Sequence, residues 1–207
     1  MSYWRIGDIR FPSLYSPQSS SYPWSNRFDD IYRQFRSLYC AKEMETCFRE
    51  LLADLRPNEK ARKDFQNTFG AEDLPAPQVR PAWYATRALV HVEPRISSGN
   101  IVDIEMIDER LRLLKKYALP FLMRGITFPD IKKMRKKDRN LTQKIARGYF
   151  DEGRAGISFS SHLDKKNCLA LFEGRADLLQ LDDPIPLSPD MTAFHKVCEE
   201  FHLQIVV

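Results

Sequence analysis

Three polar side chains in the stretch 25–57 have types and spacing that packing alone does not require. Arg27 precedes a short apolar segment, Tyr39 lies within that segment, and Glu50 follows it along the pattern of an amphipathic helix. An arginine binds anions, a tyrosine packs on a ligand or hydrogen-bonds it, and a glutamate offers a carboxylate. Together they indicate a site for an anionic ligand where a strand and a helix pack.

Two interpretations of Glu50 are open from the pattern. Glu50 flanks the apolar stripe of its helix instead of standing opposite it, which favours the rim of a pocket. The ordinary alternative is a boundary carboxylate that pairs with Arg36 or Arg49, because charges on helices are mostly solvated. Arg5 adds to the first interpretation, since its apolar neighbours in the segment 3–6 make a lone charge costly unless it meets an anion or a carboxylate.

A second polar group lies late in the chain, between two apolar strand patterns. Its members are Ser160, Ser161, His162, Asp164 and Asn167. Residues so close in sequence seldom reach the geometry of a catalytic triad, so we expect the histidine to cap or hydrogen-bond within the loop.

The elements that must position these residues alternate without a regular βαβ order, which predicts an α+β fold with mostly antiparallel sheets. Strands are expected at 3–6, 36–41, 83–92, 100–104, 157–159, 168–172 and 203–207. Helices are expected at 44–55, 60–69, 107–118, 141–150 and 191–201. Gly99 and Asn100 predict a hairpin between the strands 83–92 and 100–104. The segments 11–24 and 123–131 are expected to be loops, the latter with a short strand as alternative.

The composition predicts one domain over residues 1–207, because 43% hydrophobic and 12% aromatic residues suffice for a packed core. No apolar run approaches the roughly 20 residues needed to span a bilayer, and the first residues lack the order of a secretory signal. We therefore expect a cytoplasmic protein that does not enter membranes.

The four cysteines lie in apolar segments without CxxC pairs or nearby histidines. We expect buried free thiols, and neither a disulfide framework nor a metal site.

The net charge of +4 comes largely from one basic run, which is Lys132, Lys133, Arg135, Lys136, Lys137 and Arg139. Without interleaved aromatic residues, a solvated face is a better interpretation than nucleic-acid binding, which remains an alternative. The sequence contains no GxGxxG helix start, P-loop, HExxH or GxSxG motif.

Three segments in order carry a resemblance to a known family: YWRI, then NRFDD with LYCAKEMETCFREL, and finally GISFSSHLDKKNCLALFE. The chain resembles the RES domain family from residue 3 to about residue 173, and a helix and strand extension follows over 174–207. The resemblance implies an ADP-ribosyltransferase-like fold and an enzyme that destroys NAD+ by phosphorolysis or hydrolysis. It also implies no bound cofactor beyond NAD+ and phosphate as substrates, and a bacterial toxin neutralised by a helix-turn-helix antitoxin. A homodimer and a protein ADP-ribosyltransferase activity are further alternatives.

The resemblance also assigns site residues. The catalytic positions fall on Arg27, Tyr39, Glu50 and Ser161. The substrate-binding positions fall on Arg5, Arg27, Tyr39 and Asn167. Ser158 and Ser160 are alternatives for the family serine. The segment around Arg27 departs from the family pattern, because it lacks the glycines of GGRW and has Phe28 where tryptophan is common.

Overall fold

A computed structural model describes residues 1–15, 24, 26–70, 75–129, 134 and 139–207 of the chain. Most of the loop expected at 11–24 lies outside the described residues. The same holds for the basic run at 132–139, apart from Arg139.

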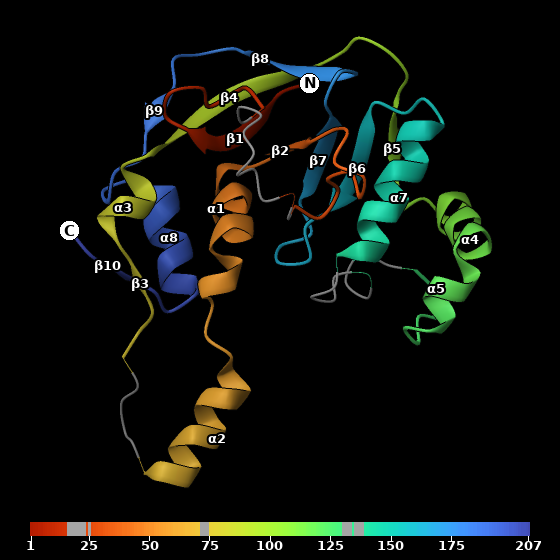
Figure 1. The fold of residues 1–207 in the computed structure, drawn as a ribbon. Helices are drawn as coiled ribbons and strands as arrows, with labels where there is room; N and C mark the ends of the chain where they lie inside the picture. The colour runs from red at the N-terminus through yellow and green to blue at the C-terminus, as the bar shows by residue number, and fades with distance from the viewer. Residues whose placement is uncertain (16–23, 25, 71–74, 130–133, 135–138) are drawn as a thin grey trace.

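An eight-stranded sheet forms the centre of the molecule (Figure 1). The strand order is β5-β6-β7-β2-β1-β4-β8, and β9 also pairs with β4. Its strands are β1 (Tyr3–Asp8), β2 (Ser37–Ala41), β4 (Arg87–Ile96), β5 (Ile101–Asp103), β6 (Gly156–Ser160), β7 (Asn167–Phe172), β8 (Ala176–Gln180) and β9 (Ile185–Pro186). All pairs in this sheet are antiparallel except β5 with β6. The predicted α+β class with mostly antiparallel strands is confirmed.

A second, two-stranded sheet joins distant parts of the chain. β3 (Gln78–Val79) pairs in parallel with β10 (Gln204–Ile205). The expected strand at 203–207 thus exists, but in a shorter form.

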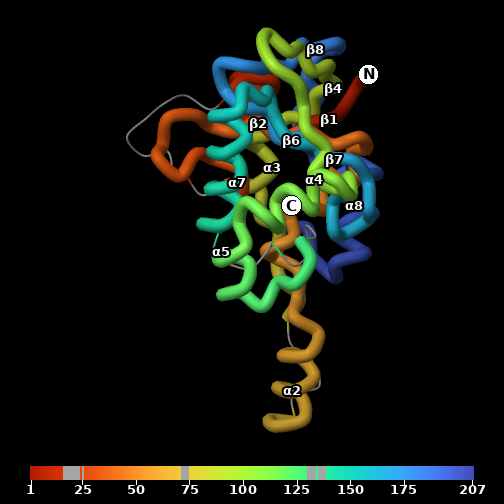
Figure 2. Tube along the Cα trace, turned by 90° about the vertical axis from the view of Figure 1, so that its right-hand side faces the viewer, coloured from red at the N-terminus to blue at the C-terminus, as the bar shows by residue number. Residues whose placement is uncertain are grey.

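Most of the described helices lie in two groups, and one helix projects away from the molecule. They are α1 (Met44–Leu52), the 3₁₀ helix η1 (Ala53–Leu55), α2 (Glu59–Phe69), α3 (Pro81–Tyr84), α4 (Ile107–Lys116), α5 (Ala118–Leu122), α7 (Asn140–Asp151) and α8 (Thr192–Glu200). Figure 1 shows α1, α3 and α8 together on one side and α4, α5 and α7 on the other. α2 projects away from the rest of the molecule in both Figure 1 and Figure 2. None of the described helices has the length and apolar character needed to cross a membrane.

α1 is held by the apolar stripe that the sequence predicts. Phe48 and Leu52 lie one helical turn apart and are fully buried. Phe48 stacks on Phe194 of α8 with ring centroids 5.4 Å apart. Burial of each such side chain stabilises the fold by about 1.5–3 kcal/mol. This packing fixes the helix that carries Glu50.

The predicted hairpin between β4 and β5 is wrong. β4 lies between β1 and β8, whereas β5 pairs with β6 at the other end of the sheet, so four strands separate β4 from β5. The chain does turn at Gly99, where φ is +76°. A Cβ on Gly99 would lie 1.9 Å from the Gly153 carbonyl oxygen, so glycine is needed here for close packing against another loop.

Two other segments differ from the predicted elements. The expected strand at 83–92 begins only at Arg87, because Pro81 starts the short helix α3 at its first position. The expected helix 107–118 breaks at Tyr117, and Pro120 lies in the first turn of α5 instead of ending a helix.

Candidate functional site

The site lies where the central sheet opens between β1 and β2. β1 runs in register with β4 along its length from Tyr3 to Asp8, whereas β1 and β2 are paired at Trp4 and Ala41. Beyond that pair, Arg5 Nη1 donates to the Tyr39 carbonyl oxygen over 2.8 Å. The Arg5 side chain thus makes the hydrogen bond that a backbone amide of the neighbouring strand would make if β1 and β2 were paired along their whole length.

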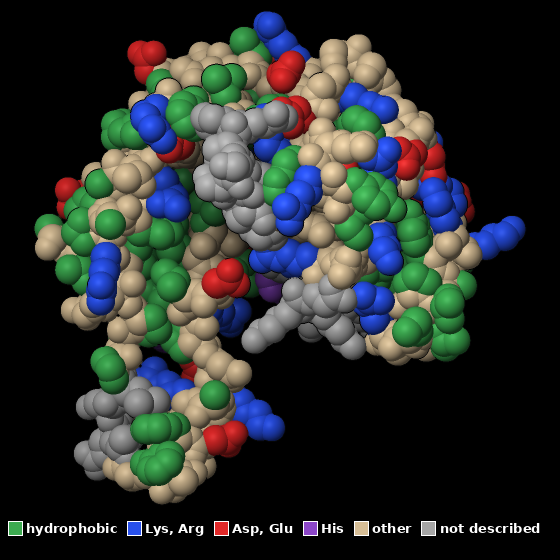
Figure 3. Space-filling model, viewed as in Figure 1, with side chains coloured by type: hydrophobic (Ala, Val, Ile, Leu, Met, Phe, Trp, Pro, Cys, Tyr) green, Lys and Arg blue, Asp and Glu red, His purple; other side chains and the backbone are tan. Residues whose placement is uncertain are grey.

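A pocket of about 350 Å³ opens at this fork. Its walls come from β1, β2, the turn around Arg27, α1, the end of β6 and the start of α7. The polar side chains that line it include Arg5, Arg27, Tyr39, Glu50, Arg139 and Ser160. Figure 3 shows this face hollowed in the middle, with basic, acidic and histidine side chains gathered around the hollow.

Glu50 contributes a carboxylate to the pocket, and Ser161 holds it. Ser161 is fully buried, and its Oγ donates to Glu50 Oε1 over 2.7 Å. The Leu163 amide donates in turn to Ser161 Oγ over 3.1 Å. Both arginines of the alternative interpretation form ion pairs elsewhere, Arg36 with Glu173 and Arg49 with Asp164.

The three candidate serines have different partners. Ser161 contacts Glu50, Ser160 contacts Glu105, and Ser158 accepts from Asn167 Nδ2 over 2.8 Å. Ser161 is therefore the serine that orients the pocket carboxylate. Its hydroxyl is directed to Glu50, so the arrangement is not that of a serine nucleophile activated by the next histidine.

Tyr39 contributes its ring to the pocket and its hydroxyl to the protein. The Phe28 amide donates to Tyr39 Oη over 2.8 Å, and Ser37 Oγ lies 3.2 Å from the same oxygen. Ser37 Oγ also donates to Asp29 Oδ1 over 2.8 Å. A serine hydroxyl has one hydrogen and a carboxylate only accepts, so the Tyr39 hydroxyl donates to Ser37. Burial, followed by the nearby Asp29 charge, raises the pKa of Tyr39 well above its ordinary value.

Arg27 lies in a turn that is fastened on two sides. The Asn26 amide donates to Asp29 Oδ2 over 3.0 Å, and the Ser37 amide donates to Asp29 Oδ1 over 3.0 Å. From α7, Gln143 Nε2 donates to the Asn26 carbonyl over 3.1 Å. These bonds fix the backbone on either side of Arg27, so its partly buried side chain lines the pocket from a defined position.

Arg5 and Asn167 lie differently from the other predicted residues. Strand alternation places Arg5 on the face of Tyr3, opposite Ile6, and it reaches the pocket through the fork. Besides the Tyr39 carbonyl, its guanidinium contacts the Pro12 carbonyl, to which Nε donates over 2.8 Å. Asn167 accepts from the Tyr3 hydroxyl over 3.1 Å, and it is not among the described residues that line the pocket.

A comparison with protein-family models tests the resemblance. The model of the RES domain family matches residues 2–191. The chain belongs to the RES domain family. A chain in the crystal structure of the M. tuberculosis MbcT–MbcA toxin–antitoxin complex is similar to this RES domain with a TM-score of 0.49 and 10% identity, over 95% of this chain and 87% of that one. No curated protein matches the chain.

The sequence pattern places Asp164 in the late polar group, but it does not predict how Asp164 and Asp29 support the site of this RES domain. Asp29 is fully buried and holds the Arg27 turn, and Asp164 bonds to Thr46 over 2.7 Å and to Arg49 over 2.9 Å. Both had a local signal, since an Asp in a turn that ends at a strand often bonds backbone amides. Their specific partners lie 8 to 118 residues away in sequence and could not be read from it.

Arg139 was assigned to a solvated basic face, and the structure places it at the pocket. It is the residue before α7, and its side chain lines the same cavity as Arg27.

The four cysteines are buried free thiols, as predicted. Burial raises the pKa of the Cys40 thiol to about 12 and that of the Cys198 thiol to about 11. Cys40, Cys47 and Cys168 line the pocket, and burial raises the pKa of each thiol, which disfavours the reactive thiolate.

Proposed function

We propose that this RES domain consumes NAD+ by cleaving the bond between nicotinamide and ribose, and that it is the toxin of a toxin–antitoxin pair. Family membership supports the reaction class. The observation that carries the proposal is the Glu50 carboxylate, which Ser161 holds in the wall of a pocket that the permanently charged Arg27 also lines.

The chemistry of the bond explains the need for a carboxylate. When the C1″–N bond breaks, its electron pair neutralises the pyridinium, nicotinamide leaves as a neutral molecule, and positive charge develops on the ribose. A fixed carboxylate beside that carbon stabilises the transition state, as carboxylates do in glycosidases. No strong general acid is required, which fits a pocket in which burial raises the pKa of both tyrosines and of the three thiols.

The arginines supply the complementary charge. NAD+ carries a pyrophosphate, and guanidinium groups bind phosphate oxygens through paired, permanently charged donors. Arg27 and Arg139 line the pocket, and both are proposed to contact the pyrophosphate or an acceptor phosphate. The Tyr39 ring packs on the bound ligand.

Two acceptors complete the reaction. Attack by an oxygen of inorganic phosphate gives ADP-ribose-1″-phosphate. Attack by water, with loss of one proton to solvent, gives ADP-ribose. The partner of the toxin is proposed to be an antitoxin with a helix-turn-helix domain, and this part rests on the family resemblance alone.

Product analysis tests the proposal. Purified protein, free of any antitoxin, is incubated with NAD+ with and without phosphate, and products are separated by liquid chromatography and mass spectrometry. We expect free nicotinamide in both cases or in the phosphate case alone, which also identifies the acceptor. Intact NAD+ with a folded protein would refute the proposal, and ADP-ribose attached to lysate proteins would favour transfer over degradation.

A matched pair of variants tests the carboxylate. Glu50→Gln keeps size and hydrogen bonding but removes the charge, and we expect kcat to fall by at least about 100-fold. Glu45→Gln is the control, because Glu45 lies on the same helix and pairs with Lys196 on the α8 side at 3.2 Å. Similar activity in both variants would contradict the assignment of Glu50.

A further inference from the structure

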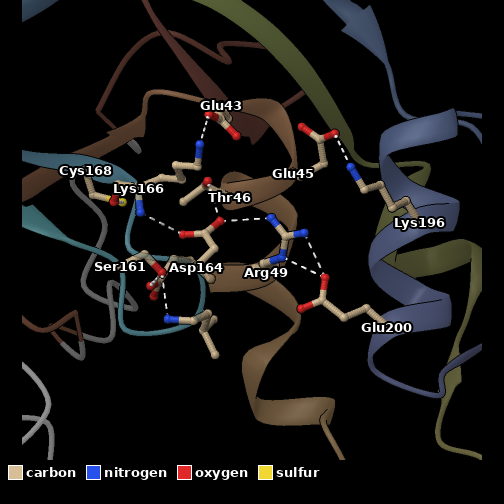
Figure 4. Close-up of polar contacts among 12 residues, drawn as sticks. Glu43, Glu45, Thr46, Arg49, Ser161, Asp164, Lys166, Cys168, Lys196 and Glu200 are labelled. Atoms are coloured by element: carbon tan, nitrogen blue, oxygen red, sulfur yellow. Dashed lines mark hydrogen bonds and ion pairs between the residues drawn. The ribbon is translucent and has the colours of Figure 1, made fainter.

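Several polar contacts join the loop after β6 to α1, and Figure 4 shows the one between Asp164 and Thr46. Ser161 donates to Glu50, and Asp164 accepts from Thr46 Oγ1 over 2.7 Å. Thr46 and Glu50 are four residues apart on the helix, so they lie one above the other on the same face. Ser161 and Asp164 are three residues apart in a tight loop that meets this face.

The Asp164 contact is largely buried and charged. Asp164 Oδ2 also accepts from Arg49 Nη1 over 2.9 Å, and the side chains of Asp164 and Arg49 are each 12% exposed. Thr46 is fully buried. On the far side, Arg49 pairs with Glu200 of α8 over 2.8 Å. Three elements thus meet at this ion pair.

The loop is closed on itself around Ser161. The Lys165 amide donates to the Ser161 carbonyl over 2.9 Å, and the Ser161 amide donates to the Lys166 carbonyl over 2.8 Å. Asp164 Oδ1 accepts from the Lys166 amide over 3.1 Å. Because the loop is internally bonded, fixing Asp164 against α1 also fixes Ser161 against Glu50.

We propose that Asp164 is a positioning residue that sets the geometry of the Ser161–Glu50 contact through its bonds to Thr46 and Arg49. The inference rests on the proposed function, because its effect on turnover passes through the Glu50 carboxylate. Asp164 does not touch the substrate in this scheme. A displacement of a reacting group by about 1 Å can cost about 100-fold in rate, so a small loosening of the loop is sufficient to be measured.

Steady-state kinetics of NAD+ cleavage test the positioning role. For Asp164→Ala we expect kcat to fall about 10–100-fold with KM within about threefold of wild type. Asp164→Asn keeps acceptor and shape but not charge, so an intermediate kcat is expected. If Asp164→Ala does not fold, Thr46→Val gives the same test, because it removes the buried donor to Asp164 with little change in shape.

The matched control is Glu43→Gln. Glu43 pairs with Lys166 over 2.6 Å, so it joins the same loop to the start of the same helix, but through side chains that are 41% and 49% exposed. We expect kcat within about twofold of wild type. Equal kcat losses in Glu43→Gln and Asp164→Ala would overturn the inference, since any link between the two elements would then suffice.

A double-mutant cycle and hydrogen exchange separate positioning from general stability. If Asp164 acts through Ser161, Asp164→Ala costs little further kcat once Ser161→Ala is present, and losses that multiply would overturn the inference. Independently of turnover, amide exchange at Leu163, which bonds to Ser161 Oγ, is expected to accelerate in Asp164→Ala and not in Glu43→Gln. Unchanged exchange would also overturn it, whereas an inactive wild type with the expected exchange pattern would refute the proposed function alone.

Discussion

Replacing Tyr39 by phenylalanine removes one oxygen from the centre of the site. That oxygen accepts the Phe28 amide over 2.8 Å and lies 3.2 Å from Ser37 Oγ. Phe28 is fully buried. The ring of the new residue keeps its packing, so the variant isolates what the hydroxyl does.

The expected loss of stability follows from the orphaned donor. A buried amide left without an acceptor costs about 1–3 kcal/mol, because water cannot replace the lost partner. For a domain of this size each kcal/mol lowers Tm by about 2–4 °C, so Tm is expected to fall by roughly 2–12 °C. Thermal unfolding followed by circular dichroism measures it.

The kinetic expectation separates a structural hydroxyl from a catalytic one. Phe28 follows Arg27 directly, so a loosened turn displaces the guanidinium and weakens NAD+ binding. We expect KM to rise about 3–10-fold while kcat stays within about threefold, the pattern of lost ground-state binding. A kcat that falls about 100-fold with an unchanged Tm would refute the reasoning, because the hydroxyl would then act on the substrate. Tyr84→Phe is the control, since the Tyr84 hydroxyl bonds to the Val206 carbonyl away from the pocket.

Two further expectations follow from the pocket. Arg139→Ala should raise KM for NAD+ or for phosphate about 10-fold, because the Arg139 side chain lines the cavity. Tm should change little, because this side chain is not buried in the core. An unchanged KM for both substrates would show that Arg139 does not belong to the site. The four thiols should react with Ellman's reagent only after unfolding, because all four are buried. A shift from pH 7 to pH 9 should not make them reactive, because burial raises the pKa of each thiol above that range. Rapid reaction of the native protein at pH 9 would contradict this expectation.

The sequence predicts those parts of the fold that are fixed by local pattern. α1 and α7 follow apolar stripes at helical spacing, and β7 follows a continuous apolar run. Hydrophobic periodicity decides these elements because burial of one face outweighs the weak intrinsic preferences of the chain. The same pattern placed Glu50 beside the apolar stripe, which is where the pocket lies.

Strand pairing is the part that local pattern does not decide. The turn at Gly99 was visible, yet β5 pairs with β6, which follows more than fifty residues later. A glycine with positive φ suits a hairpin turn, and it equally suits the close packing of Gly99 against Gly153, so the residue type does not tell which strand β5 pairs with. Local pattern also does not decide where helices end. Pro120 predicts the end of a helix from the sequence, but in the structure it lies in the first turn of α5.

The residues that support the site could not be predicted from local pattern for a related reason. Asp29 and Asp164 are ordinary loop residues in sequence, and their importance comes from partners on β2 and α1. Only the fold shows that each carboxylate holds one wall of the pocket: Asp29 holds the turn of Arg27, and Asp164 holds the loop of Ser161.

The fork between β1 and β2 explains why these residues meet. If the two strands continued to pair beyond Trp4 and Ala41, backbone amides would occupy the Tyr39 carbonyl and the sheet would be closed. Arg5 satisfies that carbonyl from the opposite face of the sheet while the strands remain apart, so the pocket is reached by Arg5 from one face and by Glu50 from the other. A lysine could not make both bonds, because it lacks the fork of donors that spans the Pro12 and Tyr39 carbonyls. Arg5 therefore has a structural role that does not depend on any ligand, because it provides a hydrogen-bond donor for the Tyr39 carbonyl at the opening of the sheet.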